Sequence, residues 1–205
     1  MTWCLVGSEM CIRDSDSTLR FPWQMTLGAI QDEQLVYEMG LEIARQCQRL
    51  GVHINFAPVV DVNSNPKNPI INNRSFGEDP TRVALLGTAY MQGLQDGGVL
   101  ACAKHFPGHG DTDADSHKTL PIIPHTKERL DSIDLVPFQQ MFQSGLGSIM
   151  VAHLYIPELD NTENLASTLS PKIVSGLLKK EMGFEGLIFT DALNMADNHI
   201  LIKNA

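Results

Sequence analysis

Long hydrophobic runs are missing from this chain of 205 residues, and so is any cluster of basic side chains. No stretch of about eighteen apolar residues occurs, so we expect no membrane-spanning segment. Acidic residues outnumber basic ones by 24 to 15, which gives a formal net charge of −9. Because no basic stripe is present to meet phosphates, a nucleic acid is not expected as the main partner.

Cysteine pairs with a recognisable spacing are missing as well. The cysteines stand at Cys4, Cys11, Cys47 and Cys102, and no CxxC motif occurs among them. We therefore expect neither a zinc site nor a disulfide framework. Cys47 and Cys102 fall within apolar patterns, where a free cysteine usually serves as a small core residue.

The N-terminal stretch lacks the features of a structural element or of a signal peptide. Residues 1–16 show neither helical nor strand periodicity, and no basic start is followed by a long apolar core. The segment from Cys4 to Ser15 resembles translated sequencing-adapter read-through. We therefore interpret residues 1–16 as a non-native leader and expect no packed element there. The domain proper is predicted to occupy residues 17–205, truncated at both ends.

Helices and strands are predicted to alternate along the rest of the chain. Apolar residues three and four apart indicate helices, and short β-branched runs between them indicate strands. Asp32 and Asp79 stand where N-caps are expected, and Gly51 and Gly97 stand where the helices should stop. The predicted helices cover residues 32–50, 79–96, 127–144 and 170–182, and the predicted strands cover residues 52–62, 99–105, 147–153 and 186–190.

This order of elements defines an α/β fold. Short apolar strands that alternate with amphipathic helices form a parallel sheet with helical crossovers. A complete (β/α)8 barrel needs roughly 250 residues, and the sequence predicts half of its strands. We therefore predict a partial (β/α)8 barrel of the TIM type, with about four parallel strands and flanking helices. A smaller open sheet is the alternative.

Ionisable residues gather where the predicted strands end. Asp61, His105, His153 and Asp191 each stand at the C-terminal end of a strand. Enzymes with parallel sheets place their chemistry at this edge. The densest group is the loop from Lys104 to His117, which holds three histidines and several aspartates. This loop is therefore the first candidate for a functional site.

Several motifs resemble glycoside hydrolase family 3. The similarity extends over about residues 18–197, and the motifs occur in the family's order. The most similar subgroup comprises bacterial β-N-acetylglucosaminidases that act on sugars derived from peptidoglycan. The resemblance implies a (β/α)8-type first domain, a carbohydrate substrate and no cofactor. The motifs are Lys104–Gly110, Asp115–His117 and Phe189–Met195, supported by Asn55–Val62 and Asn73–Gly77.

The resemblance also implies roles for six residues. Asp191 corresponds to the nucleophile of a retaining glycosidase, and His117, oriented by Asp115, corresponds to the general acid/base. Retention needs a carboxylate that attacks the anomeric carbon and a group that protonates the leaving oxygen. Residues two apart in an extended loop point to the same side, so Asp115 can hold one imidazole nitrogen while the other transfers the proton. The positions that correspond to sugar-binding residues are Arg74, Lys104 and His105.

Three alternatives stay open. A β-glycoside phosphorylase of the same fold could use the neutral histidine base, which tolerates phosphate better than a carboxylate would. An inactive fragment is the second, because an incomplete barrel exposes sheet edges and an apolar face, so we expect poor stability and weak or no activity. The third alternative is a metal-dependent hydrolase with ligands among His105, His109, Asp111, Asp113 and His117, although no HExxH spacing occurs and no metal site is predicted. The compartment, cytoplasmic or periplasmic, also stays open.

Overall fold

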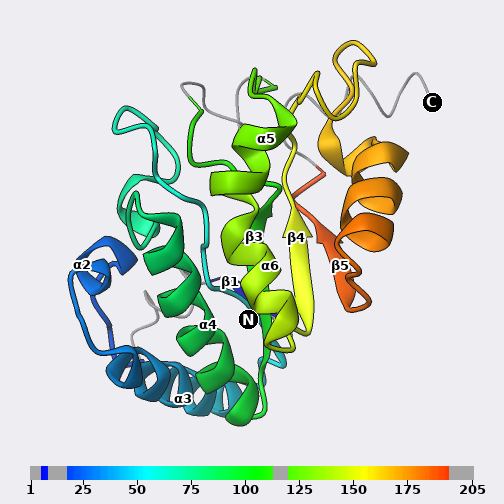
Figure 1. Cartoon of the computed structure of the whole chain (residues 1–205). Helices are drawn as coiled ribbons and strands as arrows, with labels where there is room; N and C mark the ends of the chain where they lie inside the picture. Colours follow the sequence, from blue (N-terminus) through cyan, green and yellow to red (C-terminus); the bar gives the residue numbers. More distant parts are fainter. Residues whose placement is uncertain (1–5, 9–17, 113–119, 194–205) are drawn as a thin grey trace.

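A parallel sheet organises the molecule (Figure 1). The computed structural model describes residues 6–8, 18–112 and 120–193. Within these ranges five strands lie side by side in their order along the chain, and each pairs in parallel with the next. The predicted α/β half-barrel with flanking helices is confirmed. The strands are β1 (Val6–Ser8), β2 (Ile54–Phe56), β3 (Leu100–Phe106), β4 (Ser148–Val151) and β5 (Leu187–Thr190).

The first strand lies in the stretch that we expected to stay outside the fold. Val6–Ser8 pairs in parallel with Ile54–Phe56, so β1 stands at the edge of the sheet beside β2. The expectation that residues 1–16 contribute no element is therefore wrong. A backbone ladder needs only free N–H and C=O groups on an open edge, and a segment without hydrophobic periodicity can supply its half of that ladder.

The helical layer begins with two long helices that pack closely against each other. Helix α3 (Glu33–Arg49) starts after Asp32 and helix α4 (Pro80–Asp96) after Asp79, and both carboxylates accept main-chain hydrogen bonds of the first turn. Gly93 of α4 lies so close to α3 that an added Cβ would stand 2.1 Å from a main-chain carbonyl oxygen. Both predicted helices and their N-caps are confirmed, and the glycine explains their close contact.

The third predicted helix is wound in two different ways. Helix α5 (Lys127–Arg129) passes into a π-helical segment, η2 (Leu130–Asp134), and then into α6 (Val136–Gln143). Pro137 stands in the first turn of α6, where its missing N–H leaves no hydrogen bond unmade, so a new α-helix can begin there. The fourth helix, η4 (Lys172–Glu181), is π-helical. Apolar spacing predicted both helices but does not distinguish the wider winding from the α-helical one.

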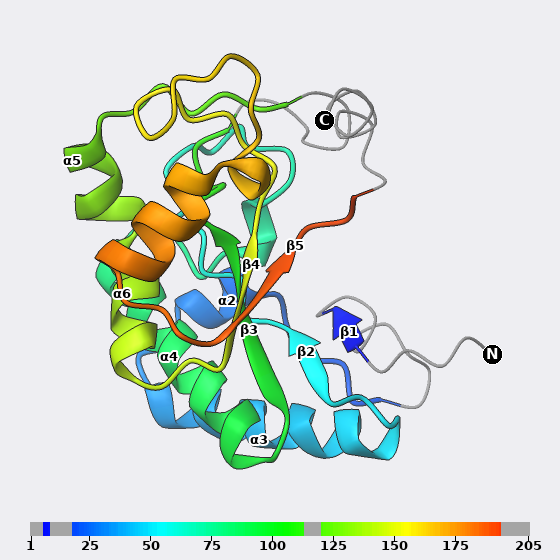
Figure 2. The same cartoon turned by 90° about the vertical axis from the view of Figure 1, so that its right-hand side faces the viewer.

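The helices and the sheet enclose the core. Turning the molecule shows α4, α6 and η4 on one side of the strands (Figure 2). Phe106 of β3 and Phe138 of α6 meet there, with ring centroids 5.3 Å apart. Cys47 and Cys102 are buried as predicted, and burial raises their thiol pKa values to about 11 and about 12, so both stay protonated. The remaining short elements are α2 (Gln24–Gly28), η1 (Asn72–Arg74) and η3 (Ser167–Leu169).

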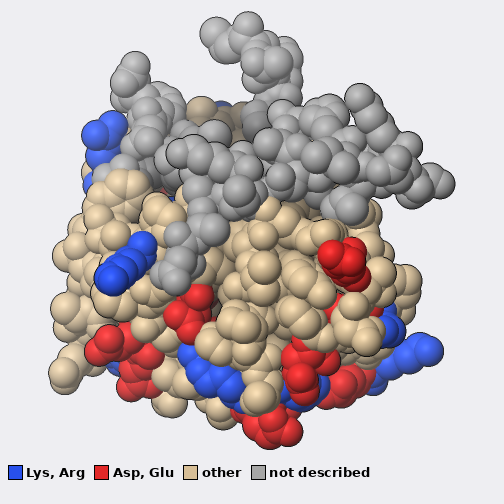
Figure 3. Space-filling view, turned by 90° about the horizontal axis from the view of Figure 1, so that it is seen from above, with Lys and Arg blue, Asp and Glu red and all other residues tan. Residues whose placement is uncertain are grey.

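The surface of the described residues mixes both signs of charge. Seen from above, Asp and Glu side chains lie beside Lys and Arg side chains along the visible rim (Figure 3). None of the helices in the described ranges is long and apolar enough to cross a membrane.

Candidate active site

The polar residues predicted at strand ends lie at one edge of the sheet. His105 is the penultimate residue of β3, His153 follows β4 by two positions, and Asp191 directly follows β5. Asp61 comes after the ladder of β2 has ended, but the chain continues beside β3 through one further bridge. Because the carboxyl ends of parallel strands meet at the same edge, the four side chains share one region.

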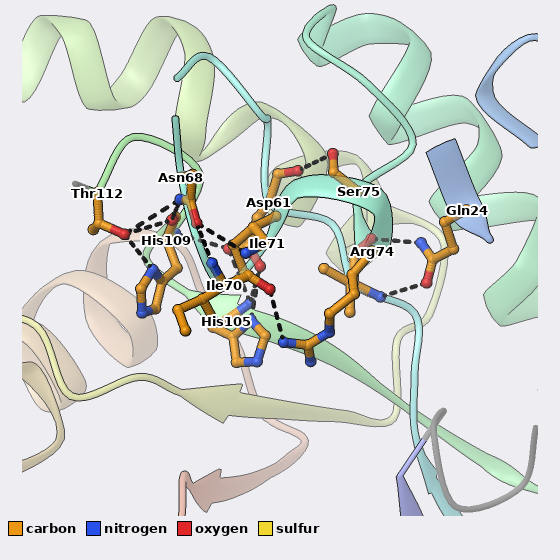
Figure 4. A network of polar contacts seen from close by, with 11 residues as sticks. Gln24, Asp61, Asn68, Ile70, Ile71, Arg74, Ser75, His105, His109 and Thr112 are labelled. Carbon is orange, nitrogen blue, oxygen red and sulfur yellow. Dashed lines mark hydrogen bonds and ion pairs between the residues drawn. The ribbon is translucent and has the colours of Figure 1, made fainter. Parts of the chain in front are cut away.

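Asp61 is the centre of a buried hydrogen-bond network (Figure 4). Its Oδ2 lies 2.7 Å from Nδ1 of His105, and its Oδ1 accepts a hydrogen bond of 2.7 Å from the main-chain N–H of His109. The main-chain nitrogen of His105 lies 3.2 Å from both oxygens. Burial raises the pKa of Asp61, but the charge of His105 and these hydrogen bonds outweigh burial, so the pKa is lowered on balance and the carboxylate is ionised.

His109 is a buried imidazole that is built into the loop. Burial and the neighbouring charge of His105 lower its pKa to about 4, so it is neutral at pH 7. Its Nδ1 lies 2.8 Å from Oγ1 of Thr112, whereas its Nε2 has no hydrogen-bond partner within the described ranges. Asn68 donates to the carbonyl oxygen of His109 at 2.7 Å and to Thr112 at 3.2 Å. These contacts suit a residue that shapes the loop.

Asp191 opens the turn after β5. Its N–H donates to the carbonyl oxygen of Val151 at 2.9 Å, and its Oδ1 accepts a hydrogen bond of 2.8 Å from the next main-chain N–H. Burial raises the pKa of Asp191, but the charges of His105, His153 and Lys104, together with that N–H, lower it by more. The carboxylate is therefore ionised at neutral pH.

His153 braces the same turn from the end of β4. Its Nδ1 lies 2.7 Å from Oγ1 of Thr168, and its Nε2 lies 3.3 Å from the carbonyl oxygen of Ala192. The sequence indicated only that His153 stands at the C-terminal end of a strand. These contacts hold the main chain at Ala192, the residue that follows Asp191.

The predicted sugar-binding residues lie around the Asp61 network. Arg74 closes η1, and its Nη1 donates to the carbonyl oxygen of Ile70 at 3.4 Å. Figure 4 shows this guanidinium beside the imidazole of His105. Lys104 precedes His105 on β3 and is buried, and its charge acts on Asp191. The fold thus brings the predicted sugar-binding residues of two separate motifs, Asn73–Gly77 and Lys104–Gly110, to one edge.

The predicted acid/base pair lies outside the described residues. Asp115 and His117 fall in the range 113–119, as does Asp113 of the metal hypothesis. Directly before this range, Asp111 pairs with Nε2 of His125. The roles of Asp115 and His117 therefore stay predictions from the sequence.

An ionic cluster that the sequence did not predict contacts the loop at Asp111. Nη1 of Arg129 donates to Asp134 at 2.8 Å, and Nη2 lies 3.8 Å from Asp111. Burial raises the pKa of Asp134 to about 6, although the charges of Arg129 and His125 oppose this shift. The one available signal was a carboxylate at a buried position of a predicted helix.

Metal-binding geometry is not found in the part of the chain that the structure describes. Residues 6–8, 18–112 and 120–193 hold no group of three or more His, Cys, Asp or Glu side chains arranged to bind an ion. His105 and His109 direct their Nδ1 atoms to Asp61 and to Thr112, and not to a common centre.

A half barrel that gathers ionised side chains at the carboxyl ends of its strands has the arrangement of a (β/α)8-type enzyme domain. The family described as Glycosyl hydrolase family 3 N terminal domain matches residues 5–205. The chain therefore belongs to glycosyl hydrolase family 3, as its motifs predicted. The matched range includes strand β1.

Named relatives point to the same subgroup. The chain is 40% identical to Beta-hexosaminidase A of Pseudoalteromonas piscicida over 203 residues, which cover 93% of this chain and 34% of that protein. It is 44% identical to a family 3 β-N-acetylglucosaminidase from Paenibacillus sp. str. FPU-7, with a TM-score of 0.84 over 86% of this chain and 34% of that one. It is 28% identical to the beta-glucoside phosphorylase BglX, with a TM-score of 0.85 over 89% of this chain and 34% of that one. The chain spans between about a third and a half of the length of the curated relatives it matches.

Proposed function

We propose that this domain belongs to a retaining glycoside hydrolase that removes terminal β-linked N-acetylglucosamine. In this proposal Asp191 attacks the anomeric carbon, and His117, oriented by Asp115, protonates the leaving oxygen. The names of the relatives, beta-hexosaminidase and β-N-acetylglucosaminidase, support this substrate class. The proposed sugar-binding residues are Arg74, Lys104 and His105.

The setting of Asp191 is the observation that carries the proposal. A carboxylate nucleophile must be ionised and held in one place while the anomeric carbon reaches it. The lowered pKa of Asp191 supports the first requirement, and the main-chain hydrogen bond to Val151 supports the second. Two of the residues whose charges lower the pKa of Asp191, His105 and Lys104, also belong to the proposed sugar-binding group. The proposed nucleophile and binding residues therefore act on one region.

A histidine acid/base suits this setting for an electrostatic reason. After His117 has given its proton to the leaving group, the imidazole is neutral and adds no negative charge beside Asp191. A second carboxylate in that place would repel the nucleophile and raise its pKa. Asp115 would hold the other imidazole nitrogen and stabilise the protonated state before the transfer.

The buried positions of Lys104 and His105 suit the recognition of hydroxyl groups. Only 4% of Lys104 and 5% of His105 is exposed, so their polar atoms are largely shielded from water. Hydrogen bonds are stronger at such sites, and a substrate that fails to satisfy the buried groups is disfavoured. These two residues would therefore discriminate between sugars.

Replacement of Asp191 by alanine tests the proposal, with 4-nitrophenyl N-acetyl-β-glucosaminide as substrate. We expect Asp191→Ala to lower kcat/KM by roughly 10⁴-fold or more. Added azide should restore turnover and yield a glycosyl azide of inverted configuration, because azide then attacks in place of the carboxylate. Asp160→Asn is the matched control, since Asp160 is a buried carboxylate that binds Ser170 and Lys172. Full activity of Asp191→Ala would refute the assignment.

A second candidate is a β-glycoside phosphorylase of the same fold. The observation in its favour is the TM-score of 0.85 with the phosphorylase BglX. In phosphorolysis, phosphate instead of water would release the sugar from Asp191 as a sugar 1-phosphate. Phosphorus NMR of a reaction in inorganic phosphate separates the two: hydrolysis gives the free sugar alone, whereas phosphorolysis gives a new sugar-phosphate signal that grows with phosphate concentration.

A further inference from the structure

Asp61 is the ionised residue of this edge that the proposed mechanism leaves without a role. Its side chain is completely buried, and it is the acceptor at the centre of the network in Figure 4. Transfer of a carboxylate from water into the protein interior is unfavourable unless hydrogen bonds and opposite charge compensate. The compensation comes from two histidines of the Lys104–His109 segment, one of which is a proposed sugar-binding residue.

The hydrogen bond to His105 fixes which ring nitrogen faces the site. An ionised carboxylate can only accept, so Nδ1 of His105 must carry the proton that lies between it and Oδ2 of Asp61, 2.7 Å away. Nε2 is then the ring nitrogen that remains for a ligand. The main-chain nitrogen of His105 lies 3.2 Å from the same carboxylate, so ring and backbone are held together.

We propose that Asp61 is a positioning residue for sugar binding, which holds His105 so that Nε2 faces a hydroxyl group of the bound sugar. This inference rests on the proposed function, because it concerns the same site. Asp61 itself is too deeply buried to touch a sugar, so it acts through His105. The same logic operates wherever a buried carboxylate sets the tautomer and the direction of a functional imidazole.

A merely structural carboxylate would behave differently. Asp160 is such a group: it is buried and accepts hydrogen bonds from Ser170, Thr162 and Lys172 around the start of η4. Loss of either carboxylate is expected to lower stability. Only the loss of Asp61 should also change which ring nitrogen of His105 faces a hydrogen-bond donor, and with it the affinity for the sugar.

Asp61→Asn is the informative variant because it keeps an acceptor for the main chain of His109 and replaces the acceptor that faces Nδ1 of His105. The amide oxygen can still accept the hydrogen bond from the main chain of His109 in place of Oδ1. The amide nitrogen then faces Nδ1 of His105 and donates to it, which moves the imidazole proton to Nε2. The variant imidazole therefore has no proton on Nδ1, whereas Nδ1 of the wild-type His105 carries one.

Nitrogen NMR of the chain labelled with ¹⁵N-histidine reads this change directly. In the wild-type chain we expect Nδ1 of His105 to be protonated and N-acetylglucosamine to shift the Nε2 signal. In Asp61→Asn we expect the proton on Nε2, while Asp160→Asn leaves the His105 signals unchanged. An unprotonated Nδ1 in the wild-type chain would overturn the proposal, and this result does not depend on whether Asp61→Asn folds.

Kinetics give a second, separate test. We expect Asp61→Asn and His105→Gln each to lower kcat/KM by tenfold or more, and Asp61→Asn to add less than threefold in the His105→Gln background, as for residues that act through one another. Effects that multiply fully would show that Asp61 does not act through His105. A wild-type enzyme that hydrolyses no glycoside would refute the proposed function, while the NMR experiment would still decide the contact between Asp61 and His105.

Discussion

The two halves of the proposed site differ in how firmly the chain holds them. On the binding side, β3 is buried along nearly its whole length, and its end is fixed by Asp61. On the nucleophile side, β5 stands at the edge of the described sheet and is partly exposed throughout, with 54% of Leu187 accessible. Within the described residues, β5 has a ladder only with β4, whereas β3 has ladders with both β2 and β4.

The proposed site has two tasks, sugar binding first and nucleophilic attack second, and different parts of the fold carry them. On the proposed binding side, buried hydrogen bonds to Asp61 hold both the ring and the main chain of His105 in the chain without a sugar. The proposed nucleophile, Asp191, is held by a main-chain hydrogen bond to Val151, and the charges of His105 and Lys104 lower its pKa. Phe56 and Phe189 join the two sides, with ring centroids 5.2 Å apart. Changes on the binding side should therefore affect both tasks, whereas changes on β5 should affect mainly the second.

The largest effect is expected from His117→Ala, which should separate the proposed acid from the proposed nucleophile, Asp191. Loss of the general acid should reduce kcat/KM by about 10² to 10⁴-fold for a glycoside with a poor, alkyl leaving group. The loss should be much smaller for 4-nitrophenyl glycosides, because nitrophenolate leaves without protonation. Asp191→Ala should impair both substrates alike. Equal losses for His117→Ala on the two substrates would contradict its assignment as the acid.

Core substitutions test the difference in packing itself. Phe106→Ala on β3 removes a fully buried ring and should lower the free energy of unfolding by about 3–5 kcal/mol. Leu187→Ala on β5 removes a half-exposed side chain and should cost about 0.5 kcal/mol or less. Urea unfolding followed by circular dichroism measures both. Comparable losses would show that β5 is packed as firmly as β3.

The pH dependence of the unfolding free energy tests whether His109, beside the proposed binding residues, is neutral in the folded chain. The pKa of His109 is lowered from 6.5 to about 4 in the folded chain, so the folded state binds fewer protons than the unfolded state between these values. Stability should therefore fall as the pH drops from 6.5 to 4, by roughly 2–3 kcal/mol from this residue.

His109→Gln should remove that loss, and unfolding free energies at pH 7 and pH 4.5 give the measurement. Asp134 acts in the opposite direction, because its pKa is raised to about 6 and its protonation favours the folded state as the pH falls. The difference between wild type and His109→Gln isolates the histidine. An identical acid response of the two proteins would contradict the neutral, buried state of His109.

Removal of metal ions should have the smallest effect. If the two-sided site is correct, kcat is unchanged after dialysis against a chelator. The metal hypothesis instead places the chemistry on the binding side alone, with His105, His109 and Asp111 among the ligands. Activity that disappears on chelation and returns with added zinc would therefore contradict the two-sided site and favour the metal hypothesis.

The order of the elements was predictable because local chemistry decided it. Asp32 and Asp79 cap α3 and α4 as their sequence positions indicated, and apolar runs mark β3, β4 and β5. Strand β1 was missed because its ladder depends on an open edge elsewhere in the fold and not on its own side-chain pattern. The π-helical winding of η4 was missed because burial of Ile173 and Leu177 fits several helical pitches.

The site could be predicted only in part for a related reason. Lys104, His105 and Asp191 stand at strand ends, where position alone indicates a function. The role of Asp61 stayed undecided because its partner, His105, is 44 residues away in the sequence, and burial of the pair arises only in the folded chain. The same holds for Asp134, whose raised pKa depends on its burial against the loop.

A covalent trap tests the central assignment most directly. A fluorinated N-acetylglucosaminyl fluoride slows the hydrolysis of a glycosyl–enzyme intermediate, so the sugar should remain attached long enough for peptide mapping by mass spectrometry. We predict one added sugar, bound to the carboxylate of Asp191. Attachment to another residue, or the absence of an adduct together with release of the α-anomer as the first product, would contradict a retaining mechanism with Asp191 as the nucleophile.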